Sequence, residues 1–232
     1  MVDRRAKVTT LVLTNPIVVP MILKLASIAA FGLLATVAHD PLPDLQLGTV
    51  LPKADHKMKD VSGKTIALKD LVGGSGLLVV FSCNTCPFVV GTEGSEGWEG
   101  RYPELGAYAK RFGVGVAFVN SNEAKRDNGD SFAEMQARYK EKGYSGAYLL
   151  DEKHVVADAF GARTTPHVFL FDKNMKLVYK GAIDDNVASA AEVKERWLHN
   201  AIENLASGKA IEPALTRNIG CSIKRLAQEH KH

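Results

Sequence analysis

The chain has 232 residues but only three cysteines, and aromatic residues make up just 7% of it. So few cysteines exclude a small scaffold held together by disulfides, and the fold must therefore depend on the packing of apolar side chains. The chain also lacks a large excess of either charge, because 29 basic residues stand against 26 acidic ones. Such a balance indicates no basic surface, and we expect no nucleic-acid partner.

The sequence has no internal repeat and no composition typical of disorder. Hydrophobic residues form 46% of the chain and charged residues 24%, which is ordinary for a globular protein with a sizeable core. We predict a leader over residues 1–38, one folded domain over residues 45–210 and a C-terminal tail over residues 211–232.

An apolar run near the N-terminus indicates export. Residues 25–35 are almost all apolar, Lys24 precedes them, and the small residues Thr36 and Ala38 occupy suitable −3 and −1 cleavage positions. These features are typical of a secretory signal peptide. We therefore expect the mature domain outside the cytoplasm, in the periplasm or secreted.

Counted from Met1 this leader is long, and a start of translation at Met21 would give it an ordinary length. The alternative is an uncleaved anchor from about Leu11 to Ala38, since a membrane-spanning helix needs about 20 largely apolar residues. In both cases the folded domain lies outside the cytoplasm, and in the second case it is attached to the membrane.

Two of the three cysteines, Cys83 and Cys86, stand close together directly after an apolar run at residues 76–81. The run has no polar alternation, which is typical of a strand buried on both faces of a sheet. Cysteines at this spacing can bring their Cα atoms within the roughly 4.4–6.8 Å that a disulfide requires. The pattern predicts a dithiol that forms and breaks a disulfide reversibly.

We expect Cys83 at the start of a helix, where unpaired amides and the helix dipole favour the thiolate and bring its pKa to roughly 3.5–7.5. Cys83 would then attack, and Cys86 would resolve the mixed disulfide. Pro87 bears on this assignment, because a proline disfavours helical angles at the residue before it. A helix that begins at Pro87 would instead make Cys86 the better-activated thiol.

A pair of cysteines can also be half of a zinc site, or a purely structural disulfide. A zinc site needs a second ligand pair at close spacing, and none of His56, His154 or His167 forms one. A structural disulfide over so short a loop would add little stability. We expect no metal and no cofactor.

Apolar runs and helical patterns alternate along the rest of the chain, which predicts an α/β fold with a mixed central sheet and helices on both faces. A hairpin with its turn at Ser62-Gly63 is expected before the first buried strand. Four glycines within residues 91–100 favour a loop or a broken helix. The expected strands are residues 114–119, 148–150, 168–171 and 177–180. Helices are expected over residues 103–111 and 154–160, and a further helix is expected to begin at the capping box of residues 131–134.

A last helix is expected from a second capping box at residues 189–192. Its predicted apolar stripe, which would pack on the sheet before Gly208 stops the helix, consists of Val193, Trp197, Ala201 and Leu205.

With the dithiol at a strand-to-helix junction and Thr165-Pro166 just before the strand at 168–171, the chain resembles the thioredoxin-like superfamily. The resemblance implies a three-layer fold with an N-terminal hairpin extension. It also implies a cis peptide bond before Pro166, beside the dithiol, and a Thr165 backbone that pairs with an extended substrate segment.

Within this superfamily the chain is most similar to the redoxin group, the peroxiredoxin-like proteins of the alkyl hydroperoxide reductase and thiol-specific antioxidant type. The similarity lies in residues 81–88, 169–172 and 181–186 and covers roughly residues 45–225. It implies a redox-active dithiol and a possible antioxidant role.

Two departures separate the chain from its relatives. Peroxidases of the superfamily have a threonine three residues before the peroxidatic cysteine and a proline four residues before that threonine. Counted back from Cys86 these positions hold Cys83 and Val79, and counted back from Cys83 they hold Val80 and Gly76. In addition, the strand before the dithiol lacks the buried acid of thioredoxins, so the proton of the second cysteine must pass to another group or to water.

Two further residues are candidates for auxiliary roles. Cys221 lies beyond the last expected helix, where it is either a third redox thiol or a buried spare cysteine that packs as a small apolar residue. His167 follows Pro166 and could influence the thiolate, whereas its alternative role is a structural hydrogen bond.

These features predict an exported thiol-disulfide oxidoreductase whose substrates are protein thiols or disulfides and which depends on a redox partner. The residues do not specify the direction of electron flow or the oligomeric state. A thiol-dependent peroxidase is one alternative. A copper(I)-binding module that uses both cysteines is another, since soft thiolates suit that ion.

Overall fold

The computed structural model describes residues 42–226. The predicted leader, with its signal peptide or membrane anchor, lies outside the described residues. Within residues 42–226, no helix combines the length and the apolar character needed to cross a membrane.

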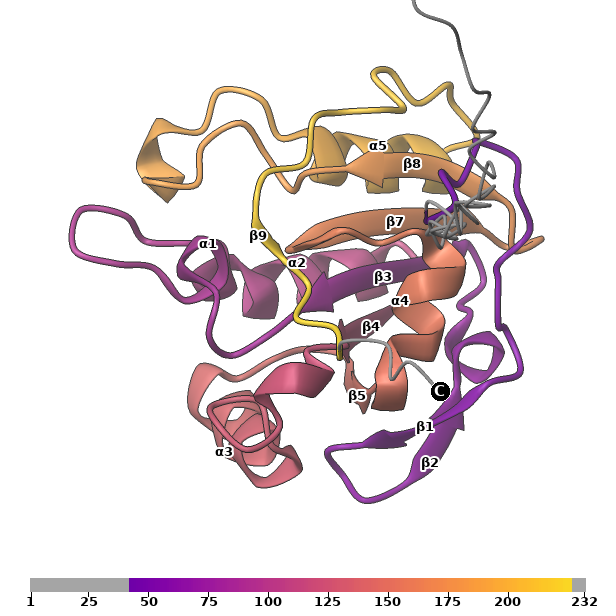
Figure 1. Ribbon diagram of the computed structural model, residues 1–232. Coiled ribbons are helices and arrows are strands. Elements are labelled where there is room, and N and C mark those ends of the chain that lie inside the picture. Colours follow the sequence, from indigo (N-terminus) through magenta and orange to yellow (C-terminus); the bar gives the residue numbers. More distant parts are fainter. Residues whose placement is uncertain (1–41, 227–232) are drawn as a thin grey trace, which may run out of the picture. The chain divides into compact units, whose positions relative to one another are not determined.

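A mixed sheet of seven strands forms the centre of the domain (Figure 1). Its central strands β3 (Gly76–Ser82), β4 (Val114–Asn120) and β5 (Ala147–Leu150) run parallel to one another. The strand order is β2 (Thr65–Ala67), β1 (Lys57–Asp60), β5, β4, β3, β7 (His167–Asp172) and β8 (Leu177–Gly181), with every pair outside the central three antiparallel. The expected mixed sheet and its N-terminal hairpin extension are confirmed.

The apolar run of β3 is buried along its whole length, because its side chains point alternately to two covered faces. Leu78 and Val80 belong to the core on one face of the sheet. Leu77, Val79 and Phe81 belong to the core on the other face. The lack of polar alternation in this run therefore results from helices that cover both sides.

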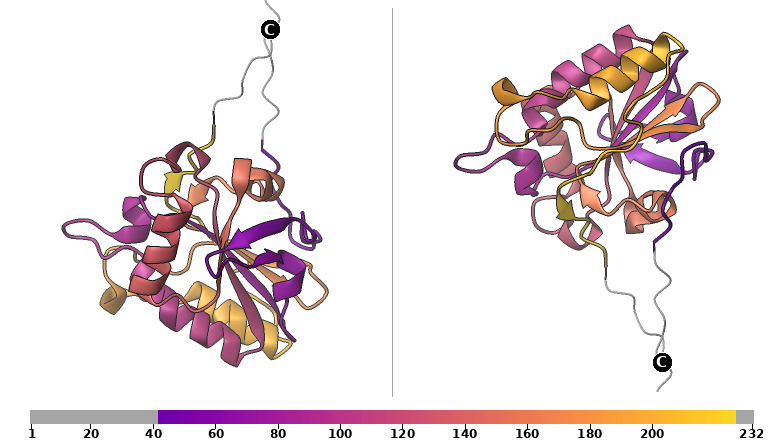
Figure 2. Two further views of the ribbon diagram at one scale, coloured as in Figure 1. Left: turned by 90° about the horizontal axis from the view of Figure 1, so that it is seen from below. Right: turned by 90° about the horizontal axis from the view of Figure 1, so that it is seen from above.

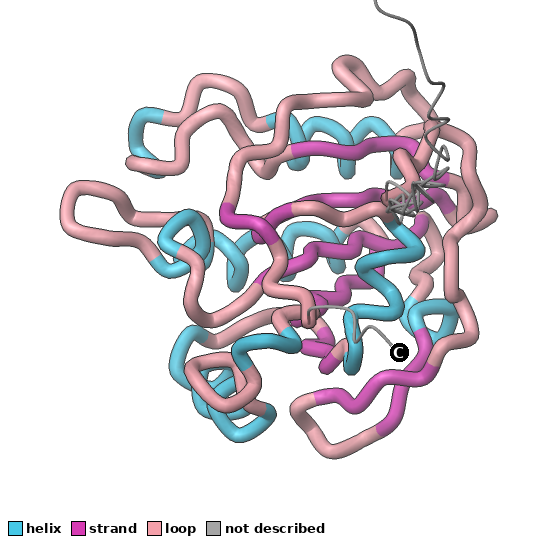
Figure 3. The backbone as a smooth tube through the Cα atoms, in the orientation of Figure 1, coloured by secondary structure: helices cyan, strands magenta, loops and turns pink. Residues whose placement is uncertain are grey.

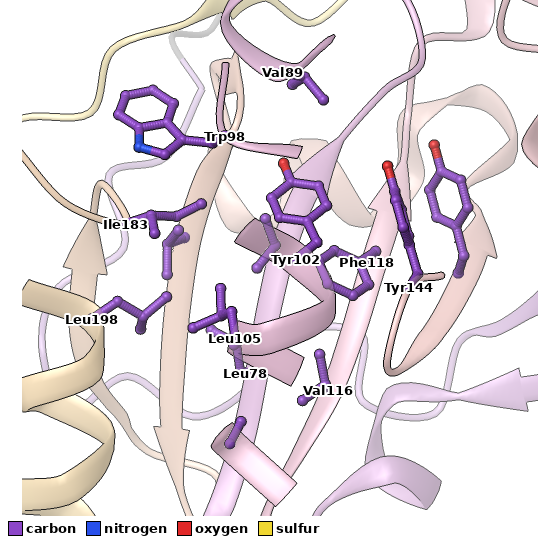
Figure 4. Close-up of a cluster of buried hydrophobic side chains, with 14 of the residues drawn as sticks. Leu78, Val89, Trp98, Tyr102, Leu105, Val116, Phe118, Tyr144, Ile183 and Leu198 are labelled. Atoms are coloured by element: carbon purple, nitrogen blue, oxygen red, sulfur yellow. The ribbon is translucent and has the colours of Figure 1, made fainter. Parts of the chain in front are cut away.

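Three helices cover the first face: α2 (Tyr102–Arg111), α3 (Phe132–Lys142) and α5 (Trp197–Ala206). Both views of Figure 2 show α2 and α5 side by side. Aromatic rings fill much of this core, and Tyr102 stacks on Phe118 with ring centroids 4.7 Å apart (Figure 4). This packing holds the layer of helices on β3 and β4 and so fixes the end of the sheet where the dithiol lies.

The second face is covered by α4 (Val155–Phe160) and by the short 3-10 helix η1 (Leu68–Leu71). Phe160 of α4 packs edge-on against Phe81 and Phe169, with ring centroids 5.2 Å away in both cases. The helix predicted at residues 154–160 is thereby confirmed, with a start one residue later than expected.

The capping box predicted at residues 131–134 is confirmed at the start of α3. The Ser131 hydroxyl accepts the Glu134 amide at 3.2 Å, and the Glu134 carboxylate accepts the Ser131 amide at 2.8 Å. Residues 91–100 form a loop that ends in the short 3-10 helix η2 (Glu99–Arg101), as their glycines indicate. Two more 3-10 turns, η3 (Glu123–Lys125) and η4 (Glu152–His154), precede α3 and α4.

The second capping box, at residues 189–192, does not begin the last helix, and that prediction is wrong. Ser189 makes no capping bond, and residues 190–192 form only the 3-10 turn η5 (Ala190–Glu192), after which a loop leads to α5 (Figure 3). The Asp185 carboxylate accepts the amides of Lys194 and Glu195, which holds this connection outside a helix.

Because α5 begins only at Trp197, its buried stripe also differs from the prediction. The fully buried apolar residues of this helix are Leu198, Ala201 and Ile202. Trp197 and Leu205 are partly buried at the edge of the same core, and Val193 lies before the helix. The helix ends at Ala206, shortly before Gly208, as expected.

Candidate active site

The two neighbouring cysteines lie at the carboxyl end of β3, both as free, buried thiols. Cys86 is the N-cap residue of the short helix α1 (Pro87–Val90), with Pro87 in its first turn. The expectation that Cys83 begins the helix is therefore wrong. Proline is favoured in the first helical turn, and it keeps the residue before it extended, which makes Cys86 the residue at the helix start.

Thr165 contacts both thiols. The Cys83 Sγ lies 3.2 Å from the Thr165 hydroxyl, and the Cys86 thiol donates to the Thr165 carbonyl at 3.0 Å. The peptide bond between Thr165 and Pro166 is cis, as the resemblance implied. The structure therefore brings together four residues that the sequence analysis singled out.

The surroundings of Cys86 favour its thiolate. The hydrogen bond from the Cys83 thiol, together with the side chain and the amide of Cys221, lowers the pKa of Cys86 to about 5, although burial acts in the opposite direction. The Cys221 amide donates to the Cys86 Sγ at 3.4 Å. The Thr165 side chain lowers the pKa of Cys86 as well.

The surroundings of Cys83 favour the protonated thiol. Its hydrogen bond to Cys86, its complete burial and the negative charge of Asp130 together raise the pKa of Cys83 well above the ordinary value. One proton is thus held between the two sulfurs, on the side of Cys83.

Asp130, which the sequence analysis did not select, fixes the loop between the cysteines. Its carboxyl group is fully buried and accepts four hydrogen bonds. Two come from the dithiol loop, where the Asn84 amide donates at 2.7 Å and the Thr85 hydroxyl at 2.9 Å. The other two come from the side chains of Asn120 and Asn122, at 2.8 and 3.1 Å.

A sequence signal for this arrangement exists in the polar run that follows β4. The carboxyl ends of parallel strands meet at one edge of a sheet, so residues directly after β4 lie beside those directly after β3. Asn120, Ser121 and Asn122 are all buried at that edge. Buried polar side chains need hydrogen-bond partners: Asp130 provides one for the two asparagines, and Asp151 accepts the Ser121 hydroxyl at 2.8 Å.

The side chain of Asn84 is held on both sides as well. Its amide group donates to the Gly129 carbonyl at 2.9 Å, and its oxygen accepts the Tyr148 hydroxyl at 2.9 Å. A side chain on Gly129 would overlap the Thr85 methyl group, so the loop from 127 to 130 packs tightly on the dithiol loop. The spacing of the two thiols is therefore determined by a rigid surrounding.

His167 is not a hydrogen-bond partner of either thiol in the described part of the chain. Its Nδ1 accepts the Arg163 amide at 3.4 Å, and its ring packs against Phe169 at 4.5 Å between centroids. Burial, with the nearby charges of Lys180 and Arg163, lowers the pKa of His167 to about 3. The ring is neutral at ordinary pH and has the surroundings of a structural histidine.

Cys221 lies beside the dithiol, 135 residues further along the chain than Cys86. It belongs to β9 (Cys221–Ser222), which pairs antiparallel with β6 (Thr164–Thr165), with Cys221 opposite Thr165. Burial and the neighbouring Cys86 raise the pKa of the half-buried Cys221 to about 11. The third cysteine is thus in contact with Cys86, which the sequence alone left open.

A mixed sheet with helices on both faces and a dithiol beside a cis-proline defines a protein with the thioredoxin-like fold. Residues 47–180 match the AhpC/TSA family. The chain belongs to the AhpC/TSA family of redoxins, and this membership indicates an oxidoreductase.

Two solved structures share 30% sequence identity with the chain. One is an uncharacterised conserved protein from Geobacillus kaustophilus, with a TM-score of 0.71, which covers 79% of this chain and 94% of its own. The other is a hypothetical protein from Sinorhizobium meliloti 1021, with a TM-score of 0.69, which covers 80% of this chain and 98% of its own.

A thioredoxin-like protein solved in its oxidised form is 15% identical, has a TM-score of 0.50, and covers 69% of this chain and 97% of its own. At this identity the likeness concerns the fold alone. No curated protein matches the sequence.

The ionisation of Cys86 leads to a first prediction. The reduced protein, followed by the ultraviolet absorbance of the thiolate, should show a first ionisation with a midpoint near pH 5, whereas an unperturbed cysteine titrates near about 8.5. Because the pKa is lowered, the thiolate should be present above this pH and lost below it. Cys86→Ser should remove the step, and a step that persists in that variant would contradict the assignment.

The buried Asp130 leads to a second prediction. In Asp130→Asn the negative charge disappears, so the ionisation of Cys83 should move to lower pH. The new asparagine would also place an amide nitrogen where one carboxylate oxygen of Asp130 accepts hydrogen bonds. The loss of these bonds should lower the free energy of unfolding by about 1–3 kcal/mol.

The matched control is Asp127→Asn, an exposed carboxyl group three residues earlier in the same loop. This substitution should change neither the pH at which Cys83 ionises nor the denaturant concentration at the midpoint of unfolding. Equal effects of the two substitutions would mean that Asp130 acts only through the net charge of the loop.

Proposed function

We propose that this protein is a thiol-disulfide oxidoreductase in which Cys86 attacks and Cys83 resolves. The observation that supports this most strongly is the contrast between the two sulfurs. Cys86 begins a helix and is surrounded by hydrogen-bond donors, whereas Cys83 is fully buried beside a negative charge. These roles are the reverse of those expected from the order of the cysteines in the sequence.

In the first step, the Cys86 thiolate attacks one sulfur of a disulfide in a partner protein. The Cys86–partner bond forms as the partner's S–S bond breaks, and the second partner sulfur leaves as a thiolate that takes up a proton. The lowered pKa of Cys86 makes the attacking species abundant at neutral pH.

In the second step, Cys83 gives its proton to water and attacks the Cys86 sulfur. The Cys83–Cys86 bond forms, the bond between Cys86 and the partner breaks, and the partner's remaining sulfur leaves as a thiolate that takes up a proton. Two electrons have then passed from the dithiol to the partner. Formation of the mixed disulfide removes the negative charge on Cys86 and with it the hydrogen bond that holds the proton on Cys83. Cys83 therefore ionises more readily once the mixed disulfide has formed, which is when its attack is required.

The substrates that fit this site are protein thiols and disulfides. We assign to Thr165, beside Pro166, the role of pairing through its backbone with an extended segment of the partner, next to the Cys86 sulfur. The antiparallel pairing of β6 with β9 supports this role, because a segment of the chain itself pairs with the Thr165 backbone at that position.

A thiol-dependent peroxidase is the alternative that family membership favours. The positions before each cysteine lack the threonine and proline of the peroxidases, which argues against it. For the copper(I) alternative, no group of three or more metal-ligating side chains is arranged for a metal within the part of the chain that the structure describes.

Reduction of insulin disulfides with dithiothreitol as electron donor tests the proposal. The wild type should accelerate insulin precipitation. Cys86→Ser should abolish the acceleration because the attacking thiolate is lost. The double variant Cys83→Ser, Cys221→Ser, mixed with insulin without dithiothreitol, should instead accumulate a mixed disulfide between Cys86 and insulin, because no neighbouring thiol is left to release it. Hydrogen peroxide consumption with the same donor serves as the comparison. Efficient peroxide consumption without insulin reduction would favour the peroxidase.

We also propose that the protein is exported, on the strength of the apolar run before Thr36 and Ala38. N-terminal sequencing of the mature protein should then give a start at His39 or Asp40. A mature protein that retains Arg4 would contradict cleavage.

A further inference from the structure

The segment that contains Cys221 is fixed to the domain at its upstream end. Residues 214–225, here named the C-terminal strap, run across the end of the sheet where β3 ends and β7 begins (Figure 1). The Ala214 carbonyl accepts the Lys180 amide at 3.0 Å. The Thr216 hydroxyl accepts the Ala182 amide at 2.9 Å and lies 2.8 Å from the Tyr179 hydroxyl.

The downstream end of the strap is fixed as firmly. The Ile223 side chain is buried in the core on the α4 side of the sheet, and its amide donates to the Arg163 carbonyl at 3.0 Å. The Arg225 guanidinium donates to the Asp158 carboxylate at 2.7 Å and to the Ala162 carbonyl at 2.6 Å. The strap is thus held on both sides of Cys221.

Between these two anchors, the strap lies in the position that the proposed function assigns to a substrate. Its residues 221 and 222 pair antiparallel with β6, and the Asn218 side chain donates to the Thr164 hydroxyl at 2.6 Å. Cys221 is opposite Thr165, and its amide points to the Cys86 sulfur. A cysteine in an extended segment next to the attacking thiol is what a partner protein would present.

Gly220 permits this close approach. A Cβ atom there would lie 2.8 Å from the Thr165 carbonyl carbon and closer still to its oxygen, where no side chain can fit. The residue before Cys221 is therefore restricted by the backbone of the groove.

We propose that the C-terminal strap is an internal substrate and that Cys221 forms a disulfide with Cys86. The proposal rests on the proposed function, because it uses Cys86 as the attacking thiol. Starting from the Cys83–Cys86 disulfide, a Cys221 thiolate attacks the Cys86 sulfur, the Cys86–Cys221 bond forms, and Cys83 leaves as a thiolate and takes up a proton. The exchange conserves electrons, and the first disulfide comes from the disulfide of a partner or of glutathione.

This arrangement has a consequence for access to the site. Cys83 has no exposed surface and Cys86 only 3%, so a partner reaches the dithiol after the strap has left β6. Oxidation to the Cys86–Cys221 disulfide would tie the strap covalently to the site and keep partners out, whereas in the reduced protein only hydrogen bonds and side-chain packing hold it.

Peptide mapping tests the disulfide directly. Trypsin leaves Cys83 and Cys86 on one peptide, residues 70–101, and Cys221 on another, residues 218–224. Cys83→Ser, oxidised with glutathione disulfide and quenched with acid, should give these two peptides joined by a disulfide with release of two glutathione molecules. The control Cys86→Ser should give no joined peptides, since Cys83 is fully buried and faces Thr165.

A second experiment tests the strap without altering a cysteine. Gly220→Ala should push the strap from the groove and raise the rate at which iodoacetamide alkylates Cys86 in the reduced protein by about tenfold or more. Gly74→Ala is the matched control, because a Cβ atom at Gly74 meets no neighbour within 4 Å, and it should leave the rate unchanged.

The outcomes separate the two proposals. Joined peptides in Cys83→Ser, together with faster alkylation in Gly220→Ala, support the internal substrate even if the protein reduces no insulin. A stable glutathione adduct on Cys86 without joined peptides would overturn it, even if insulin is reduced. Equal alkylation rates in Gly220→Ala and Gly74→Ala would also overturn it.

Discussion

The site depends on the hydrogen bonds that the buried carboxyl group of Asp130 accepts. A carboxylate removed from water is stable only when its oxygens are bonded, so the surrounding chain must supply donors. Here the donors come from the end of β4 and from the two residues between the cysteines. One group thereby sets the path of the dithiol loop and adds the negative charge that keeps Cys83 protonated.

From this constraint follows the asymmetry of the two sulfurs. The loop held by Asp130 ends at Cys86, where Pro87 starts a helix, and Thr165 closes the site from the opposite side. Hydrogen-bond donors from Cys83 and Cys221 surround the Cys86 sulfur, whereas the Cys83 sulfur lies near the negative charge of Asp130, which disfavours its thiolate. Membership of the AhpC/TSA family agrees with redox chemistry at such a site, and the thiol-disulfide reaction is the form of it that we propose.

Much of the fold could be predicted from local patterns, and the failures have local causes too. The apolar runs at β3 and β4 became central strands because helices cover both faces. The Ser-x-x-Glu pattern at residues 131–134 caps α3, but the same pattern at residues 189–192 does not begin α5. The Asp185 carboxylate accepts the Lys194 amide, which a helix would have used in its own hydrogen bonds. The position of Cys86, rather than Cys83, at the start of α1 follows from Pro87, an alternative that the sequence offered but did not decide.

The sequence by itself determined the close spacing of Cys83 and Cys86 and the buried strand before them, because both depend on neighbours along the chain. Only the tertiary structure decided that Asp130 lies beneath the dithiol and that Cys221 lies beside it. These contacts join residues 46 and 135 positions apart. They depend on which strands pair and on where the chain returns to the sheet, which no local pattern specifies.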